Sequence, residues 1–295
     1  MFITKHKTWF IGFSTLLVLV SLIVIGVRGL DYGIEFTGGS VLEVSYEERP
    51  EVADLRDALA EAGFEDALVQ PFGDNGYVIK TKPLSEDERK TLVAATSIGE
   101  ATSNTERFNS IGPSVGRELR TKSLYALIAV SIGIVLFVAY AFRKVSKPVS
   151  SWTYGIVAVL ALIHDIIIPV GILTLMGTEI DTLYVVGLLS ILGLSVNDTI
   201  VVFDRIRENL ADDGGATNRE AFTSTVGNAI HDTMTRSIFT SLTLVVVLLA
   251  LYFAGPVATR TLSLVLLLGT IVGTYSSIFL ASPLLTVLVK KKVTK

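Results

Sequence analysis

Six long apolar runs alternate with polar segments along the 295 residues of this chain. Each run approaches the roughly 20 residues that a helix needs to cross the hydrocarbon core of a bilayer. The runs predict membrane spans at Trp9–Val27, Ser123–Phe142, Trp152–Leu175, Leu183–Phe203, Ser237–Phe253 and Leu262–Val289. Because Ser282-Pro283 interrupts the last run, we expect its helix to bend or stop there. The pattern predicts an α-helical polytopic membrane protein.

The first run has two interpretations, an uncleaved span or a cleaved signal peptide. Its apolar core is longer than the about 7–15 residues of a signal-peptide core, and no A-x-A-like cleavage site follows it. We therefore favour an uncleaved first span.

In the polar segment 28–122, short stretches with the hydrophobic pattern of strands and helices replace the long apolar runs, as in a small α+β domain. Gly73-Asp74-Asn75-Gly76 is a hairpin signal between two apolar stretches. Ser85-x-x-Glu88 has the capping-box pattern of a helix start. The predicted elements are strands at 40–46, 67–72, 77–81 and 105–111 and helices at 51–62 and 85–98. Their order, β-α-β-β-α-β, predicts a ferredoxin-like domain.

Composition supports the membrane assignment. Half of the residues are hydrophobic, 18% are charged and the mean hydropathy is +0.59, whereas soluble domains carry about 25% charged residues. The chain has no cysteine, which excludes disulfides, thiolate chemistry and Cys-ligated zinc. Residues 28–122 hold 11 Lys and Arg against 18 Asp and Glu, a net charge of −7. This acidic balance argues against nucleic acid as a partner.

Basic residues gather at alternate ends of the predicted spans. They are Lys5, Lys7, Arg143, Lys144, Lys147, Arg205, Arg207, Arg219, Arg236, Lys290, Lys291, Lys292 and Lys295. The short loops on the other side hold Glu179, Asp181 and Arg260. Because short cytoplasmic loops carry an excess of Lys and Arg, we expect both termini in the cytoplasm and residues 28–122 outside.

The spans and loops divide the chain into five segments. They are 1–27, 28–122, 123–203, 204–236 and 237–295. In the fourth segment, Phe222, Val226, Ile230 and Met234 recur every four residues. This spacing predicts an amphipathic helix in the cytoplasmic loop, which lies at the membrane interface and feeds the fifth span.

The strongest chemical candidate is Asp198, about five residues inside the end of the fourth run. An ionisable side chain at membrane depth costs roughly 2.5–3.5 kcal/mol and is tolerated where it has a partner or carries ions. Asp198 therefore indicates a membrane protein that moves charge. The alternative is a structural hydrogen bond between helices.

Other polar residues near the spans have two interpretations each. Arg236 opens the fifth span and is, by spacing alone, an ordinary basic flank. His164 and Asp165 lie near the middle of the third span, where Asp165 serves either a proton path or packing. Adjacent residues point roughly 100° apart on a helix, so we do not expect both to face one site. Asn197 either orients the Asp198 carboxyl or caps a packed face.

Two short motifs flank the polar domain. Their residues include Asp31, Gly33, Glu35, Phe36, Thr37, Gly38 and Gly39 after the first span, and Gly112, Pro113 and Gly116 before the second. Paired glycines and Gly-Pro allow sharp turns. Neither spacing matches a phosphate loop or a metal motif, so we favour hinges that join the domain to two helices over a ligand site.

Three separated motifs, Asp31–Ser40, Gly112–Gly116 and Asn197–Asn209, occur here in one order. Together they resemble the SecF family, which with SecD belongs to the RND superfamily. The resemblance covers essentially the whole chain, and one span, an outer domain and five further spans resemble half of an RND-type transporter. Glu35 departs from the family pattern, where we expect Asp, but it keeps the charge.

The resemblance implies a function that composition alone does not. It implies an auxiliary subunit of the bacterial Sec translocase, not an enzyme, that uses the proton-motive force, or sodium in some relatives, to assist preprotein translocation across the cytoplasmic membrane. It implies SecD, the SecYEG channel, YajC, the preprotein and the lipid bilayer as partners, and no cofactor or metal. It also makes Asp198 the key acid and Arg236 its partner, with Asn197 and Asp165 as further candidates for proton transfer.

Two rival functions remain open at this point. One is half of an RND-type exporter for a small molecule or lipid, which would need a substrate pocket in the outer domains. The other is a scaffold that transports nothing and only holds partners.

Overall fold

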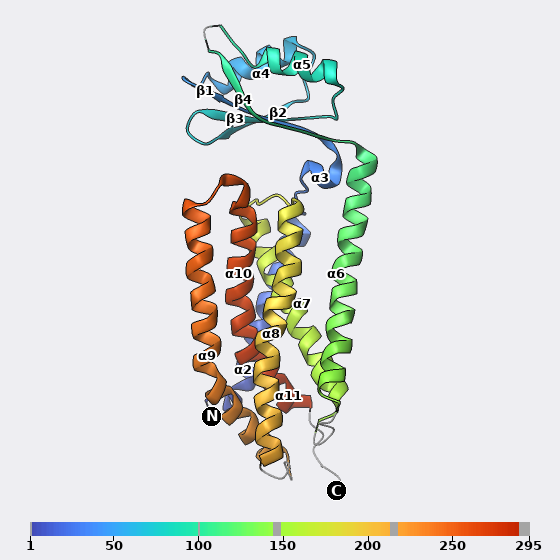
Figure 1. The fold of residues 1–295 in the computed structure, drawn as a ribbon, viewed down its shortest axis with the longest axis vertical. Coiled ribbons are helices and arrows are strands. Elements are labelled where there is room, and N and C mark those ends of the chain that lie inside the picture. Colours follow the sequence, from blue (N-terminus) through green and yellow to red (C-terminus); the bar gives the residue numbers. More distant parts are fainter. Residues whose placement is uncertain (1, 100, 144–148, 213–217, 289–295) are drawn as a thin grey trace. The chain divides into compact units, whose positions relative to one another are not determined.

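Figure 1 shows the computed structural model, which describes residues 2–99, 101–143, 149–212 and 218–288. The chain forms two compact units. The first consists of Met1–Asp31 and Tyr125–Lys295, and the second of Tyr32–Leu124.

The first unit is a helical bundle. Within the described residues, six helical stretches are long and apolar enough to cross a membrane. They are α2 (Lys7–Arg28), α6 (Pro113–Ala141), α7 (Ser151–Leu175), α8 (Thr182–Asp212), α9 (Arg219–Ala254) and the stretch Val257–Leu288. A short helix, α1 (Phe2–Lys5), precedes α2. The six predicted spans are confirmed, and we treat the chain as a multi-pass membrane protein.

The sixth stretch is broken, as its Ser-Pro pair predicts. It consists of a 3₁₀ turn (Val257–Thr259), α10 (Arg260–Ser276), a π-helical turn (Ser277–Ala281) and α11 (Ser282–Leu288). Pro283 has no N–H to donate to the carbonyl four residues earlier. The irregular turn therefore begins before the proline, at Ser277.

The expected loop at 204–236 is mostly helical. Helix α8 continues to Asp212, and α9 begins at Arg219 and runs unbroken into the fifth span. Phe222, Val226 and Ile230 are buried in the bundle core. The prediction that this helix feeds the fifth span is confirmed. Its predicted place at the membrane interface is wrong, because these apolar side chains pack against neighbouring helices.

Small residues allow the helices of the bundle to approach closely, as is common in membrane proteins. A Cβ added at Gly187 of α8 would lie 2.7 Å from a side-chain carbon of Val265 on α10. On α10, Gly269 faces Ile191 and Gly273 faces Ser195. Close packing of this kind is what a Gly-x-x-x-Gly spacing favours, and it brings the polar residues of α8 and α10 together.

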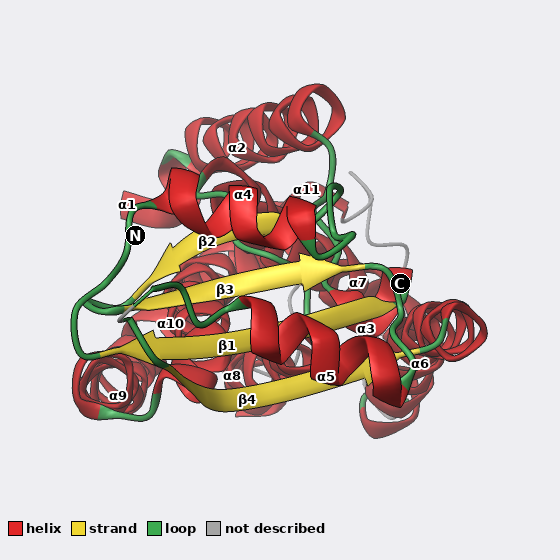
Figure 2. Ribbon diagram, turned by 90° about the horizontal axis from the view of Figure 1, so that it is seen from above, coloured by secondary structure: helices red, strands yellow, loops and turns green. Residues whose placement is uncertain are grey.

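The second unit is the predicted ferredoxin-like domain. Its strands are β1 (Gly39–Tyr46), β2 (Leu68–Phe72), β3 (Gly76–Thr81) and β4 (Ser103–Ile111), all paired antiparallel in the order β2-β3-β1-β4. Helices α4 (Val52–Glu61) and α5 (Glu86–Ala95) cover one face of the sheet (Figure 2). Leu42 and Ile79 of the sheet pack with Leu55 and Leu92 of the helices. The predicted capping box between Ser85 and Glu88 is present.

Candidate functional site

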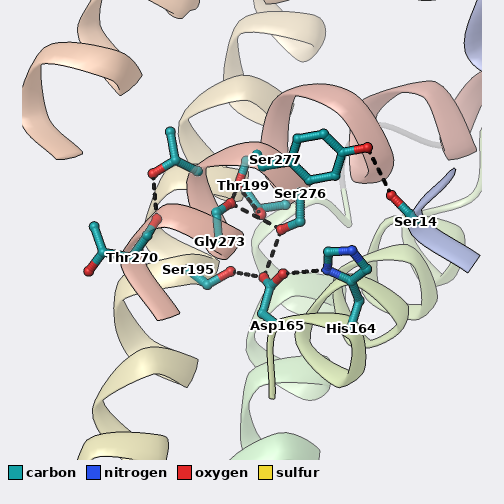
Figure 3. A network of polar contacts seen from close by, with 11 residues as sticks. Ser14, His164, Asp165, Ser195, Thr199, Thr270, Gly273, Ser276 and Ser277 are labelled. Atoms are coloured by element: carbon teal, nitrogen blue, oxygen red, sulfur yellow. Dashed lines mark hydrogen bonds and ion pairs between the residues drawn. The ribbon is translucent and has the colours of Figure 1, made fainter. Parts of the chain in front are cut away.

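A fully buried carboxyl group, that of Asp165 on α7, lies at the centre of the bundle (Figure 3). Its Oδ1 is 2.8 Å from Nδ1 of His164. Its Oδ2 accepts a hydrogen bond of 2.7 Å from Ser276 Oγ and another from Ser195 Oγ. Ser195 lies on α8 and Ser276 on α10, so this one carboxyl group joins three helices.

The expectation that His164 and Asp165 do not face one site is wrong. Both side chains are buried, and they are bonded to each other. Their Cα–Cβ bonds diverge, but rotation about the side-chain bonds brings the imidazole ring back to the carboxyl group. Nε2 of His164 is buried and has no hydrogen-bond partner among the described residues.

Hydroxyl groups extend the polar contacts from Asp165 along α10. Ser277 is bonded to Thr199 of α8, with 2.8 Å between the hydroxyl oxygens, and it donates to the carbonyl of Gly273. About one turn earlier in the chain, on α10, the Thr274 hydroxyl donates to Ser241 of α9 over 2.6 Å. Helices α8, α9 and α10 are thus linked by hydroxyl groups within otherwise apolar surroundings.

The second carboxyl group is that of Asp198 on α8. Ser237 of α9 donates to its Oδ1 over 2.6 Å. Its Oδ2 is buried and lacks a hydrogen-bond partner in the part of the chain that the structure describes. Asp198 and Thr270 both line a pocket of about 170 Å³ between α8, α9 and α10. The Thr270 hydroxyl is also buried and has no hydrogen-bond partner among the described residues. Buried oxygens of this kind are the ones that internal water satisfies.

Arg236 and Asn197 line the same pocket. Among the described residues, no ion pair joins Arg236 to Asp198, although the two are close enough to attract each other. Both Arg236 and Asn197 are exposed in this chain. Ser237, not Asn197, holds the Asp198 carboxyl. The four residues considered for proton transfer thus fall into two centres. One is around Asp165, and the other contains Asp198, Arg236 and Asn197.

The charged end of α8 contacts α9. Arg205 pairs with Glu208 on its own helix and with Asp232 of α9, at 2.7 and 2.9 Å. Arg207 pairs with Asp204 on α8. These side chains are between 37% and 59% exposed, so each pair contributes little stability. Neighbouring charges of α8 thus pair with each other, and Arg205 adds a link between two helices.

The two glycine-containing motifs meet inside the second unit. A Cβ on Gly38 would lie 2.8 Å from Pro113 Cα, and one on Gly116 would lie 2.9 Å from the Gly38 nitrogen. Gly38 and Gly39 also have φ angles of 78° and 143°, which favour glycine. The division between the units falls at Asp31/Tyr32 and Leu124/Tyr125, outside this contact. The glycines therefore allow close backbone packing in this arrangement, and a hinge at these positions stays a prediction.

Sequence reasoning missed the serines that hold the two carboxyl groups, namely Ser195, Ser237 and Ser276. Each stands inside or at the end of an apolar run, where a hydroxyl group needs a partner. That position is a signal in the sequence, but it does not say which carboxyl group the hydroxyl meets.

The fold and these two centres define a class of protein, a six-span helical membrane protein with a ferredoxin-like domain and buried carboxyl groups between its helices. Comparisons with known proteins narrow this class. The family model described as protein export membrane protein SecD/SecF, C-terminal, matches residues 91–291, and the model of the SecD/SecF GG motif matches 23–48. The chain belongs to the SecD/SecF family.

Individual relatives agree with this membership. The protein translocase subunit SecF of Thermobaculum terrenum is 39% identical, over 96% of this chain and 92% of the relative. The SecF subunit of Escherichia coli O157:H7 is 37% identical, over 94% and 84%. The crystal structure of SecDF, a translocon-associated membrane protein from Thermus thermophilus, matches with a TM-score of 0.82 and 33% identity. This chain covers only 37% of that SecDF chain, while 95% of this chain is matched.

Proposed function

We propose that this chain is a SecF-type auxiliary subunit of the Sec translocase that uses an ion gradient to assist preprotein translocation. Its relatives are named as protein translocase subunits, and its fold matches SecDF. The observation that carries the coupling is the Asp198 carboxyl group, which faces a pocket with one oxygen unpartnered among the described residues.

The chemistry of this group is reversible protonation. A proton that enters the pocket adds to Oδ2 of Asp198, because Oδ1 already accepts the hydrogen bond from Ser237. The carboxyl group then loses its charge and its attraction to Arg236, and its new O–H becomes a donor. A change of charge between α8 and α9 alters the relative energies of their arrangements, and this is how proton flow would move the helices.

Asp165 has a different role in this proposal. Both of its oxygens already accept hydrogen bonds or contact His164, and the group is completely buried. We assign Asp165 to holding α7, α8 and α10 in register, because a change of its charge would disturb three helices at once.

The remaining assignments follow from the relatives and from the charge pattern. Because the chain covers about 37% of a SecDF chain, SecD is the partner that would supply the rest of the bundle. SecYEG, YajC and the preprotein are further proposed contacts. The distribution of basic residues supports a topology with both termini in the cytoplasm and 28–122 outside. Single cysteines introduced at Ser97 and at Asn218 should react with a membrane-impermeant reagent from opposite sides of the cell membrane.

The pocket beside Asp198 suits small occupants. It measures about 170 Å³, whereas sites for small molecules usually measure about 300–1,000 Å³. Water and protons fit this volume.

The decisive test is preprotein translocation into vesicles that contain the complete translocase with its SecD partner. Asp198→Asn should abolish the stimulation by an imposed proton gradient, and Asp198→Glu should retain part of it. Asp204→Asn is the matched control, because this acid lies on the same helix but is exposed and paired with Arg207.

Normal gradient-dependent translocation by assembled Asp198→Asn would refute the proposal. If a sodium gradient stimulates translocation and a proton gradient does not, the coupling ion is sodium, and the proposed role of Asp198 stands.

A further inference from the structure

Two basic side chains converge on a second pocket that shares no residue with the Asp198 pocket. Lys7 opens α2 and Arg219 opens α9. The pocket measures about 370 Å³ and is lined by Thr4, Lys7, Arg219, Glu220, Thr223 and Ser224. Lys7 and Arg219 are close enough to repel each other, so the fold holds two positive charges together at one opening.

Both cations also contact the end of α11. Lys7 Nζ donates to the Thr286 hydroxyl over 3.0 Å, and Arg219 Nε donates to the Thr286 carbonyl over 3.2 Å. These bonds place positive charge at a helix C-terminus, which is favourable in itself. They use only one N–H of each side chain. The other N–H groups of Lys7 and the two terminal guanidinium nitrogens of Arg219 have no carboxylate partner among residues 2–99, 101–143, 149–212 and 218–288.

The surroundings increase the positive potential. Arg219 is the first residue of a 36-residue helix, whose N-terminus carries a partial positive charge. Glu220 also lines the pocket, but it is exposed and forms no ion pair with Lys7 or Arg219 in the described part of the chain. Hydroxyl groups of Thr4 and Thr223 complete a polar lining.

The pocket lies at the level of the membrane surface. Lys7 comes two residues before the predicted first span, and Thr286 comes three residues before the end of the predicted sixth span. The aromatic side chains of Phe2 and Trp9, on either side of Lys7 in sequence, are 68% and 64% exposed. Exposed aromatic side chains near Lys7 in the sequence are typical of the membrane interface.

We infer that this pocket binds the phosphate of an anionic phospholipid. An arginine guanidinium can contact two phosphate oxygens at once, and the lysine ammonium adds a point charge. Basic pockets between membrane helices on the cytoplasmic side are suited to anionic headgroups. The site does not depend on the proton role of Asp198.

The expected effect follows from the charges. Each Lys or Arg near an anionic membrane surface strengthens binding about fivefold. Removing both should weaken binding of an anionic lipid by about 25-fold and leave binding of a zwitterionic lipid unchanged.

The test is native mass spectrometry of the full chain in neutral detergent, titrated with phosphatidylglycerol or with phosphatidylcholine. The test variant is Lys7→Gln with Arg219→Gln. The control is Arg143→Gln with Arg207→Gln, which removes the same charge outside the pocket. Lys7→Arg with Arg219→Lys should keep the preference for phosphatidylglycerol. Thermal unfolding of each variant checks that it is folded.

Three results would overturn the inference. The first is equal binding of the two lipids by the wild-type chain, which needs no variant. The second is an equal loss of phosphatidylglycerol in the test and control variants. The third is displacement of phosphatidylglycerol by millimolar inorganic phosphate that also binds without lipid, because the site would then take a soluble anion.

Discussion

Replacement of Gly116 by alanine tests whether the two glycine-containing motifs form a packed junction. The new Cβ would lie 2.9 Å from the Gly38 nitrogen and 3.1 and 3.2 Å from the carbonyl carbon and oxygen of Phe36. All three are main-chain atoms, which cannot rotate away as a flexible side chain can. The backbone of α3 (Ile34–Thr37) must therefore shift, and overpacking of this kind costs about 1–3 kcal/mol.

Gly133 provides the control on the same helix, because a Cβ there meets nothing within 4 Å. Alanine stabilises a helix interior by up to about 1 kcal/mol relative to glycine. This gain is common to both variants, so the difference in stability between them isolates the steric term of about 1–3 kcal/mol.

Hydrogen exchange of the α3 amides measures the effect locally. The Phe36 and Gly38 amides donate to Gly33 and Ile34 carbonyls at 3.0 and 2.9 Å. If Gly116→Ala opens this contact, their exchange should quicken about 5- to 150-fold relative to Gly133→Ala. Equal protection of these amides in both variants would refute the packed junction and restore the hinge interpretation.

Two further predictions concern other contacts. Ser237→Ala should lower the free energy of unfolding in detergent by about 1 kcal/mol, because it removes the hydroxyl that donates to Asp198 between α8 and α9. Ser237→Thr keeps a hydroxyl and should retain this stability. Equal losses of stability in both variants would contradict the role of the hydrogen bond. Ser85→Ala should cost the ferredoxin-like domain about 1 kcal/mol in urea unfolding. The Ser85 hydroxyl and backbone N–H hold the pKa of Glu88 below its ordinary value, so this stabilisation is complete above the unfolded-state pKa and is lost as the pH falls through the lowered folded-state pKa. An unchanged acid dependence in Ser85→Ala would count against this assignment.

Local patterns predicted the elements of this fold because each element is encoded within a short stretch. The six apolar runs and the β-α-β-β-α-β order are properties of neighbouring residues, and so is the capping box at Ser85. The run Phe222–Ile230 shows the limit of such patterns. Its four-residue spacing indicates an amphipathic helix, but only the neighbouring helices determine that the apolar face is buried in the bundle.

The candidate site was predictable only in part for the same reason. Asp198 and Asp165 stand out as charges within apolar runs. Their partners do not, because Ser195 is 30 residues and Ser276 is 111 residues from Asp165 in sequence. The glycines of the GG motif were expected to provide turns, whereas close approach between Gly38 and Gly116 requires a contact that no local pattern contains.

Two neighbouring serines at the end of α10 limit how that helix can move, namely Ser276, its last residue, and Ser277, the first residue of the π-helical turn. Ser276 is bonded to Asp165 of α7, and Ser277 is bonded to Thr199 of α8. Both bonds lie at the same depth, just where the regular helix gives way to the π-helical turn. Sliding α10 along its axis by one turn, about 5.4 Å, would break both bonds together. Tilting about this level would keep both, so we expect rocking about these two serines to cost less than sliding of α10.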